Sequence, residues 1–151
     1  IVLQVAVNHL MVRLAEMPQE FPQVRSVRQA VFQQEQGVAP ELEFDGQDEA
    51  AQHFLAFWDH RPVGTTRIRL LENQSAKIER VAVLAEARGL GIGKQLMETA
   101  LFFLQQQRVQ EAQVHAQLHV QDFYEKLGFV AEGAVFFEAE IPHVKMKKRL
   151  A

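Results

Sequence analysis

Cysteine is absent from the 151-residue sequence. Its absence excludes a disulfide framework, a zinc–thiolate site and a cysteine nucleophile, and it fits a reducing compartment such as the cytoplasm. Long apolar runs are also missing, because no stretch reaches the ~20 apolar residues that cross a membrane. The apolar residues 1–7 lack the basic flank and the cleavage site of a signal peptide. We therefore expect a cytoplasmic protein that does not act at a membrane.

Positive charge is missing from one long segment. No Lys or Arg lies between Arg28 and Arg61, although seven Asp and Glu residues do. The net charge is −3, whereas a nucleic-acid-binding protein is expected to carry a basic face, so nucleic acid is not expected as a partner. The acidic segment is either a solvated loop or a surface that attracts a cationic ligand or a partner protein.

The remaining pattern predicts one domain with an α/β fold. Apolar residues make up 48% of the chain, and no repeat or linker-like stretch divides it, so we expect a single domain over residues 1–151. Alternating and helically spaced apolar residues predict the order of elements. Strands are expected at 10–14, 54–58, 63–71, 77–83, 109–116, 130–137 and 144–150, helices at 22–37, from 92 onward and at 120–127, and a loop at 41–52. This order is typical of a sheet of mixed direction.

Three glycines, Gly89, Gly91 and Gly93, lie between a predicted strand and a predicted helix. Glycine permits positive φ and close approach of a ligand, and the unpaired N–H groups of a helix start attract phosphate. Without a ligand the same segment would be a tight turn. The dinucleotide fingerprint G-x-G-x-x-G does not fit, and neither does the nucleotide-triphosphate loop, because Gln95 follows Lys94 where Ser or Thr is required.

The pattern that fits is R-x-x-G-x-G, formed by Arg88, Gly91 and Gly93 after the strand at 79–83. It resembles the acetyl-CoA-binding motif of the GNAT superfamily of N-acetyltransferases, and residues 123–129 resemble that superfamily's second motif. The resemblance extends over residues 24–149. Within that range the sequence is similar to the small ElaA-like branch at residues 31–36, 44–46, 115–117 and 141–143.

This resemblance implies a single-domain, mostly antiparallel sheet that is flanked by helices and splayed at the acetyl-CoA site. It also implies transfer of an acetyl group from acetyl-CoA to a primary amine of a small molecule or peptide, by direct attack in a ternary complex. Two other functions stay open: a sensor that binds CoA or acyl-CoA without turnover, and an interaction protein that uses the acidic segment. A homodimer is left open as well.

The resemblance also implies which residues hold the cofactor. Main-chain groups of one strand pair with the pantetheine arm, main-chain amides of the glycine loop hold the pyrophosphate, and Gln117 bonds to the pantetheine or the acceptor. The strand residues are Val81, Ala82 and Val83, and the loop residues are Arg88, Gly89, Leu90, Gly91, Ile92, Gly93 and Lys94. No metal is expected, because His115 and His119 lack a third ligand.

Tyr124, the one tyrosine of the chain, matches the residue that lies beside the thioester sulfur in the resembled family. A phenol can protonate or hydrogen-bond a departing thiolate, although a helical Tyr can instead pack on the core.

Glu79 is the first candidate for the base that deprotonates the amine; its alternative role is an ion pair with a nearby Arg, and the histidines are rivals. Candidate acceptor contacts are Glu35, Asp45, His53, His115, Glu138 and His143.

Overall fold

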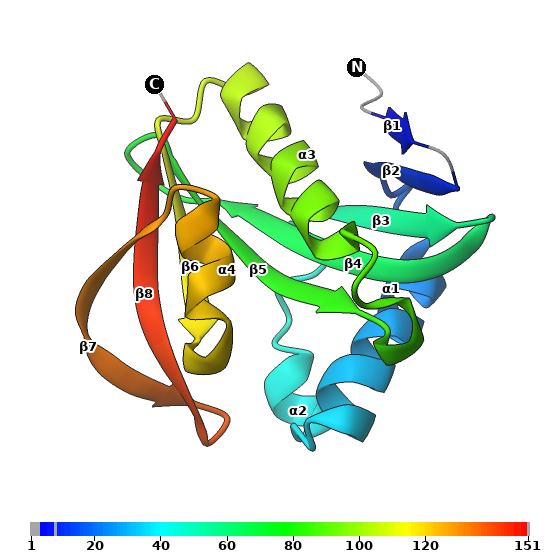
Figure 1. Cartoon of the computed structure of the whole chain (residues 1–151), viewed down its shortest axis with the longest axis horizontal. Coiled ribbons are helices and arrows are strands. Elements are labelled where there is room, and N and C mark those ends of the chain that lie inside the picture. Colours follow the sequence, from blue (N-terminus) through cyan, green and yellow to red (C-terminus); the bar gives the residue numbers. More distant parts are fainter. Residues whose placement is uncertain (1–3, 8, 151) are drawn as a thin grey trace.

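One sheet organises the chain (Figure 1), and the computed structural model describes residues 4–7 and 9–150. The strands are ordered β1-β2-β3-β4-β5-β6-β8-β7 across the sheet. Their bounds are β1 Gln4–Val7, β2 Leu10–Leu14, β3 Gln52–Trp58, β4 Arg61–Leu70, β5 Ser75–Val83, β6 Glu111–Gln117, β7 Val130–Glu138 and β8 Ile141–Arg149. All neighbours are antiparallel except β5 and β6, so the expectation of a mostly antiparallel α/β sheet is confirmed.

The sheet splits between its one parallel pair of strands. β5 pairs with β6 only at its start, where Ser75 to Lys77 face Glu111 to Gln113. Beyond that point the two strands diverge, as Figure 1 shows, while β6 stays paired with β8 up to Gln117. The second half of β5 therefore has an edge that no strand covers. This opening is the splayed sheet that the sequence resemblance implied.

The two long helices cover opposite faces of the central strands (Figure 1). Successive side chains of β3 point to opposite faces. Phe54 and Ala56 are buried in the core that includes α3 (Ile92–Gln106), whereas Leu55 and Phe57 are buried with Val24 of α1 (Phe21–Arg28). Burial on both faces explains why β3 is apolar at successive positions rather than at alternate ones.

The remaining helices are short and lie beside the split. The π-helix η1 (Gln29–Glu35) continues α1, α2 spans Pro40–Glu43, and α4 spans Gln121–Lys126; single 3-10 turns η2 (Ala85–Ala87) and η3 (Leu118–Val120) precede α3 and α4. None of the helices in residues 4–7 and 9–150 is long and apolar enough to traverse a bilayer.

The structure departs from the sequence expectations in three elements. The first helix begins at Phe21 and changes to π geometry at Gln29 instead of running evenly to Gly37. The acidic segment contains α2, because Pro40 fits the first turn of a helix. The sequence pattern also did not predict β1, which pairs with β2.

Candidate active site

The split between β5 and β6 opens into a cavity of about 1000 Å³. Its walls come from η1, α2, the end of β4, β5, the glycine loop, the end of β6, α4 and the β7–β8 turn. Most of the site residues expected from the sequence line it: Glu35, Asp45, Glu79, Val81, Ala82, Val83, Arg88, Gly89, Gly91, Ile92, Gly93, Lys94, His115, Gln117, Tyr124, Glu138 and His143. Two do not. Leu90 points to solvent, and His53 is buried behind the sheet, where Nε2 lies 2.9 Å from the Asp48 carbonyl oxygen.

The glycine loop places the start of α3 at this cavity. Gly91 is the residue that precedes the helix and has a φ of 78°, a left-handed conformation that strains other residues. A Cβ at Gly91 would meet nothing within 4 Å, so open space lies in front of it. The first amides of α3 have no partners inside the helix and carry the positive end of its dipole. This geometry suits a phosphate group.

A bulge in β5 shapes the opposite side of the cavity. Thr65 pairs with Ala82 and Arg67 pairs with Glu79, so β5 holds one extra residue, and Arg80 in it has a φ of 55°. Thr65 and Arg67 share a face of β4, so their partners Glu79 and Ala82 also share a face. The bulge thereby places Glu79 on the same face of β5 as Ala82, and both residues line the cavity.

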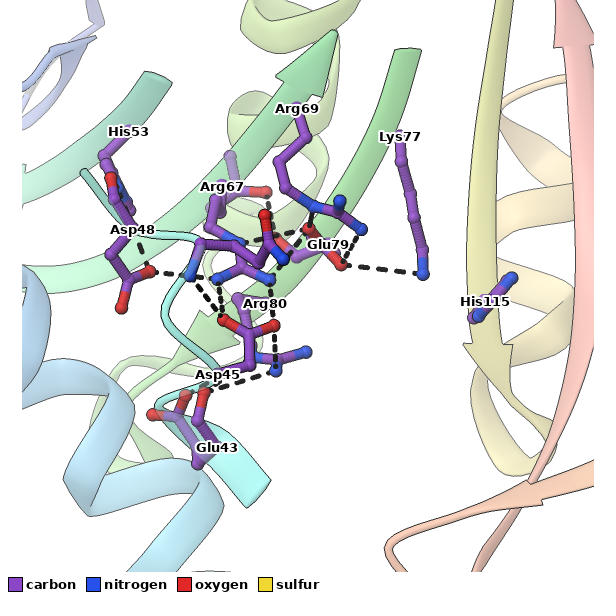
Figure 2. A network of polar contacts seen from close by, with 12 residues as sticks. Glu43, Asp45, Asp48, His53, Arg67, Arg69, Lys77, Glu79, Arg80 and His115 are labelled. Atoms are coloured by element: carbon purple, nitrogen blue, oxygen red, sulfur yellow. Dashed lines mark hydrogen bonds and ion pairs between the residues drawn. The ribbon is translucent and has the colours of Figure 1, made fainter. Parts of the chain in front are cut away.

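A network of ion pairs fixes the acidic segment to the sheet (Figure 2). Arg28 and Arg67 have fully buried side chains, and buried charges are tolerated only when they are paired. Arg28 binds Glu43 and lies 2.6 Å from Asp48, measured from Nη1 to Oδ1. Arg67 Nη1 lies 2.8 Å from Asp45 Oδ1 and 3.0 Å from Asp48 Oδ1. Burial would lower the pKa of Arg67, but its carboxylate partners outweigh burial and raise it.

Replacing Arg28 with Met is expected to destabilise the fold strongly. The change leaves Glu43, whose side chain is 1% exposed, with Arg80 as its remaining partner among the described residues. Breaking a buried pair by removing one member costs about 3–5 kcal/mol of unfolding free energy. Urea denaturation measures it. Arg61→Met is the matched control, because the exposed Arg61–Glu86 pair is worth at most ~1 kcal/mol. Equal losses in the two variants would contradict the stabilising role of the buried network.

Carboxylates of the acidic segment are therefore already neutralised by arginines. Glu43 and Asp45 also contact Arg80, and Glu35 binds the Arg88 guanidinium at 2.5 Å. The Arg88 guanidinium pulls the pKa of Glu35 below its usual value. These residues therefore do not present a row of free negative charge that would attract a cationic acceptor.

Glu79 lies where three cations meet. Arg67 Nη2 is 2.8 Å from Glu79 Oε1, Arg69 donates to the same oxygen, and Lys77 Nζ is 3.6 Å from Oε2. Burial would raise the pKa of Glu79, but the Arg69 hydrogen bond and the charges of Arg67 and Lys77 outweigh it, so the pKa is lowered. The carboxylate stays ionised at neutral pH and holds a proton weakly.

Tyr124 reaches the cavity from α4 between two aromatic rings. Phe123 and Phe129 meet it edge-on, with ring centroids 5.0 and 6.0 Å away. Burial raises the pKa of the phenol to about 12. The hydroxyl therefore stays protonated throughout the neutral and mildly alkaline range, and it is available as a hydrogen-bond donor.

A second polar group lies on the wall opposite Glu79. His115 Nδ1 of β6 is 2.6 Å from Glu138 Oε1 of β7, and His143 Nε2 of β8 is 3.9 Å from Glu138 Oε2. His143 Nδ1 donates to the carbonyl oxygen of Ile141 at 2.7 Å. The His115 hydrogen bond is the main reason why the pKa of Glu138 is lowered. With Nδ1–H donated to Glu138, His115 Nε2 is left as a proton acceptor.

Comparison with known proteins agrees with this geometry. The profile of the acetyltransferase (GNAT) domain matches residues 17–150. A Bacillus subtilis (strain 168) protein named as an acetyltransferase is 36% identical over 126 residues, which cover 82% of this chain and 85% of the relative. The chain belongs to the GNAT acetyltransferase family.

Solved structures share the fold of this chain. An N-acetyltransferase structure from Lactobacillus plantarum has a TM-score of 0.88 and 27% identity, covering 95% of this chain and 100% of that one. Escherichia coli ElaA has a TM-score of 0.76 and 29% identity, with 89% and 92% covered. The resemblance to the ElaA-like branch is confirmed. As a GNAT member the protein is an acyltransferase, in a family that uses acetyl-CoA and acts on amines.

The GNAT cavity also contains residues that sequence reasoning did not select. Arg69, Lys77 and Arg80 line it, although the alternation of charged residues on β4 and β5 was visible in the sequence. Gln36 at the end of η1 accepts a hydrogen bond of 3.0 Å from Gln117 of β6, which joins the two walls of the split. No spacing in the sequence connects these two amides. Within the described residues, no three His, Asp or Glu side chains gather in a way that could hold a metal ion.

Proposed function

We propose that the protein transfers the acetyl group of acetyl-CoA directly to a primary amine while both substrates are bound. One observation carries the proposal: the split of the sheet brings the glycine loop, the exposed edge of β5 and Tyr124 to a single cavity. An acyl-enzyme on cysteine is excluded because the chain has none. The test is amine-dependent release of CoA thiol from acetyl-CoA.

In this proposal the cofactor extends along one wall of the cavity. The amides at the start of α3, from Gly91 onward, bind the pyrophosphate. The pantetheine arm lies along Val81 to Val83, whose edge β6 leaves uncovered, and it adds hydrogen bonds as an extra strand would. Gln117, at the end of β6, is within the same cavity and can bond the arm from the other side. The thioester then reaches Tyr124.

The transfer itself makes one bond and breaks one. The amine nitrogen attacks the thioester carbonyl carbon, and the carbon–sulfur bond breaks with its electron pair going to sulfur. Tyr124 donates its hydroxyl hydrogen bond, or its proton, to the departing thiolate. The raised pKa of Tyr124 keeps that hydrogen in place at working pH. The proton lost by the amine goes to a base on the cavity wall.

Two bases are available for that proton. Glu79 is the proposed acceptor, directly or through water, and its ion pairs make it a weak one. The His115–Glu138 pair on the facing wall is the alternative, because the Glu138 carboxylate accepts a hydrogen bond from Nδ1 and leaves Nε2 of the imidazole to accept the proton.

Glu79→Gln is expected to lower the rate at neutral pH by ~100-fold, with partial recovery as the pH rises. Recovery is expected because the fraction of free amine grows with pH without help from a base. Initial rates from pH 6 to 10 measure it, with Glu111→Gln, a β6 carboxylate outside the cavity, as the control. A wild-type profile in Glu79→Gln together with the alkaline recovery in His115→Gln would assign the base to His115.

A further inference from the structure

Two cations form an unusual pair at the acceptor end of the cavity. Arg69 of β4 and Lys77 of β5 are direct cross-strand partners. Like charges at such positions repel and destabilise a sheet. Both side chains line the cavity, and their exposed fractions of 26% and 17% show that ligands can reach them. Glu79 offsets part of this repulsion, but both cations also face the cavity.

The surrounding carboxylates do not satisfy this pair. Five cations share four carboxylates in the ion-pair network; these are Arg28, Arg67, Arg69, Lys77 and Arg80 with Glu43, Asp45, Asp48 and Glu79. Within the described residues, Glu79 is the one carboxylate that pairs with Arg69 or Lys77, and Arg67 binds it as well. Lys77 Nζ, at 3.6 Å from Glu79, is too distant for a hydrogen bond, so its three N–H groups have no acceptor there. Lys77 thus brings to the cavity wall N–H groups that Glu79 does not bind.

We propose that Arg69 and Lys77 bind an anionic group, a carboxylate or a phosphate, carried by the amine acceptor. This inference rests on the proposed transfer and names its substrate class. A planar guanidinium beside a flexible ammonium is a strong combination for such oxyanions. The substrate is therefore bipolar, with its anionic end at Arg69 and Lys77 and its amine toward Tyr124.

The opposite wall of the cavity agrees with this orientation. Glu138, which is 43% exposed and already bonded to His115, faces the cavity from the far side of the split. Figure 2 shows His115 on β6 across from Lys77 on β5. An acceptor that spans the cavity then meets positive charge at one end and a carboxylate–imidazole pair near its amine. Arginines pair with carboxylates of the acidic segment, so this segment does not restrict the acceptor to purely cationic amines.

The test uses acceptors that share one aminoethyl amine and differ in the distal group. β-Alanine carries a carboxylate, O-phosphoethanolamine a phosphate, and β-alaninamide a neutral amide. We expect kcat/KM for an anionic acceptor to exceed that for β-alaninamide by ~10-fold or more, because each charge-assisted hydrogen bond adds to binding. The ratio between β-alanine and O-phosphoethanolamine identifies which anion is preferred. A longer series of amino acids and their carboxamides repeats the comparison at other lengths.

Lys77→Met and Arg69→Met are expected to lower the ratio of kcat/KM for the anionic acceptor to kcat/KM for β-alaninamide toward 1. Lys77→Arg is expected to retain this ratio. Arg61→Met is the control, because Arg61 is an exposed arginine of the same strand as Arg69 and lies outside the cavity. A ratio that Lys77→Met leaves unchanged, or equal rates with anionic and neutral acceptors, overturns the anion site.

Binding without turnover separates this proposal from the proposed function. Chemical shifts of the CoA-saturated protein are followed during titration with β-alanine and with β-alaninamide. Tighter binding of β-alanine than of β-alaninamide, lost in Lys77→Met, supports the anion site whether or not CoA is released. If no CoA is released, that outcome contradicts the acetyl transfer but not the anion site. Release of CoA at equal rates with anionic and neutral amines would support the acetyl transfer and contradict the anion site.

Discussion

Gly91→Glu is expected to abolish acetyl-CoA binding, the largest effect of any single change in the cavity. The new side chain enters the open space in front of α3, where the amides are proposed to hold the pyrophosphate. Its negative charge also occupies the positive end of the helix dipole. Isothermal titration measures the loss, which we expect to exceed ~100-fold in dissociation constant.

The control must separate backbone strain from loss of the anion site. Gly37→Glu introduces the same charged residue at a φ of 70° with open space around it, outside the cavity lining. Both variants carry the cost of a left-handed conformation, and thermal unfolding checks that each is folded. Wild-type affinity in folded Gly91→Glu, or equal losses in both variants, would remove the glycine loop from the cofactor site.

Tyr124→Phe is expected to lower kcat by ~100-fold or more while leaving the acetyl-CoA dissociation constant almost unchanged. The hydroxyl interacts most strongly when negative charge develops on the sulfur, so its loss raises the barrier rather than weakening the bound state. The aromatic ring remains between Phe123 and Phe129, so packing is preserved. Steady-state kinetics with a thiol readout and a separate binding titration measure the two quantities.

The pH profile of the wild-type enzyme gives a second check on this residue. Burial raises the Tyr124 pKa to about 12, so the phenol should not ionise during the assay. We therefore expect no fall in kcat between pH 8 and 10 from loss of this acid. An alkaline limb that disappears in Tyr124→Phe would contradict a permanently protonated phenol.

The proposed cofactor wall comes from local motifs. The glycine loop, the strand before it and Tyr124 are close in sequence, and their spacing depends on one strand–turn–helix unit. The structure brings these parts to a single cavity, where the resemblance implied that they would meet. The splayed sheet was also implied, and the pairing limited to residues 75–77 of β5 shows where it begins.

The contacts that hold the acidic segment and join the two walls of the cavity could not be predicted, because they depend on long-range register. Arg28 and Asp48, which bind each other, are 20 residues apart in the sequence, and Gln36 and Gln117 are 81 apart. The bulge at Arg80 changes which residues of β5 share a face, and an arginine with positive φ leaves no signal in the sequence. Counting acids between Arg28 and Arg61 therefore suggested free negative charge, whereas the fold pairs many of them with arginines.

The most direct test of acetyl transfer by this protein is an assay of acetyl-CoA with a panel of primary amines, read by thiol release and by mass spectrometry of the products. We expect equal amounts of free CoA and N-acetylated amine, dependence on the amine, no acetylated protein intermediate, and loss of the signal in Tyr124→Phe. Acetyl-CoA binding without amine-dependent thiol release from any acceptor would contradict acetyl transfer and would indicate a CoA-binding sensor.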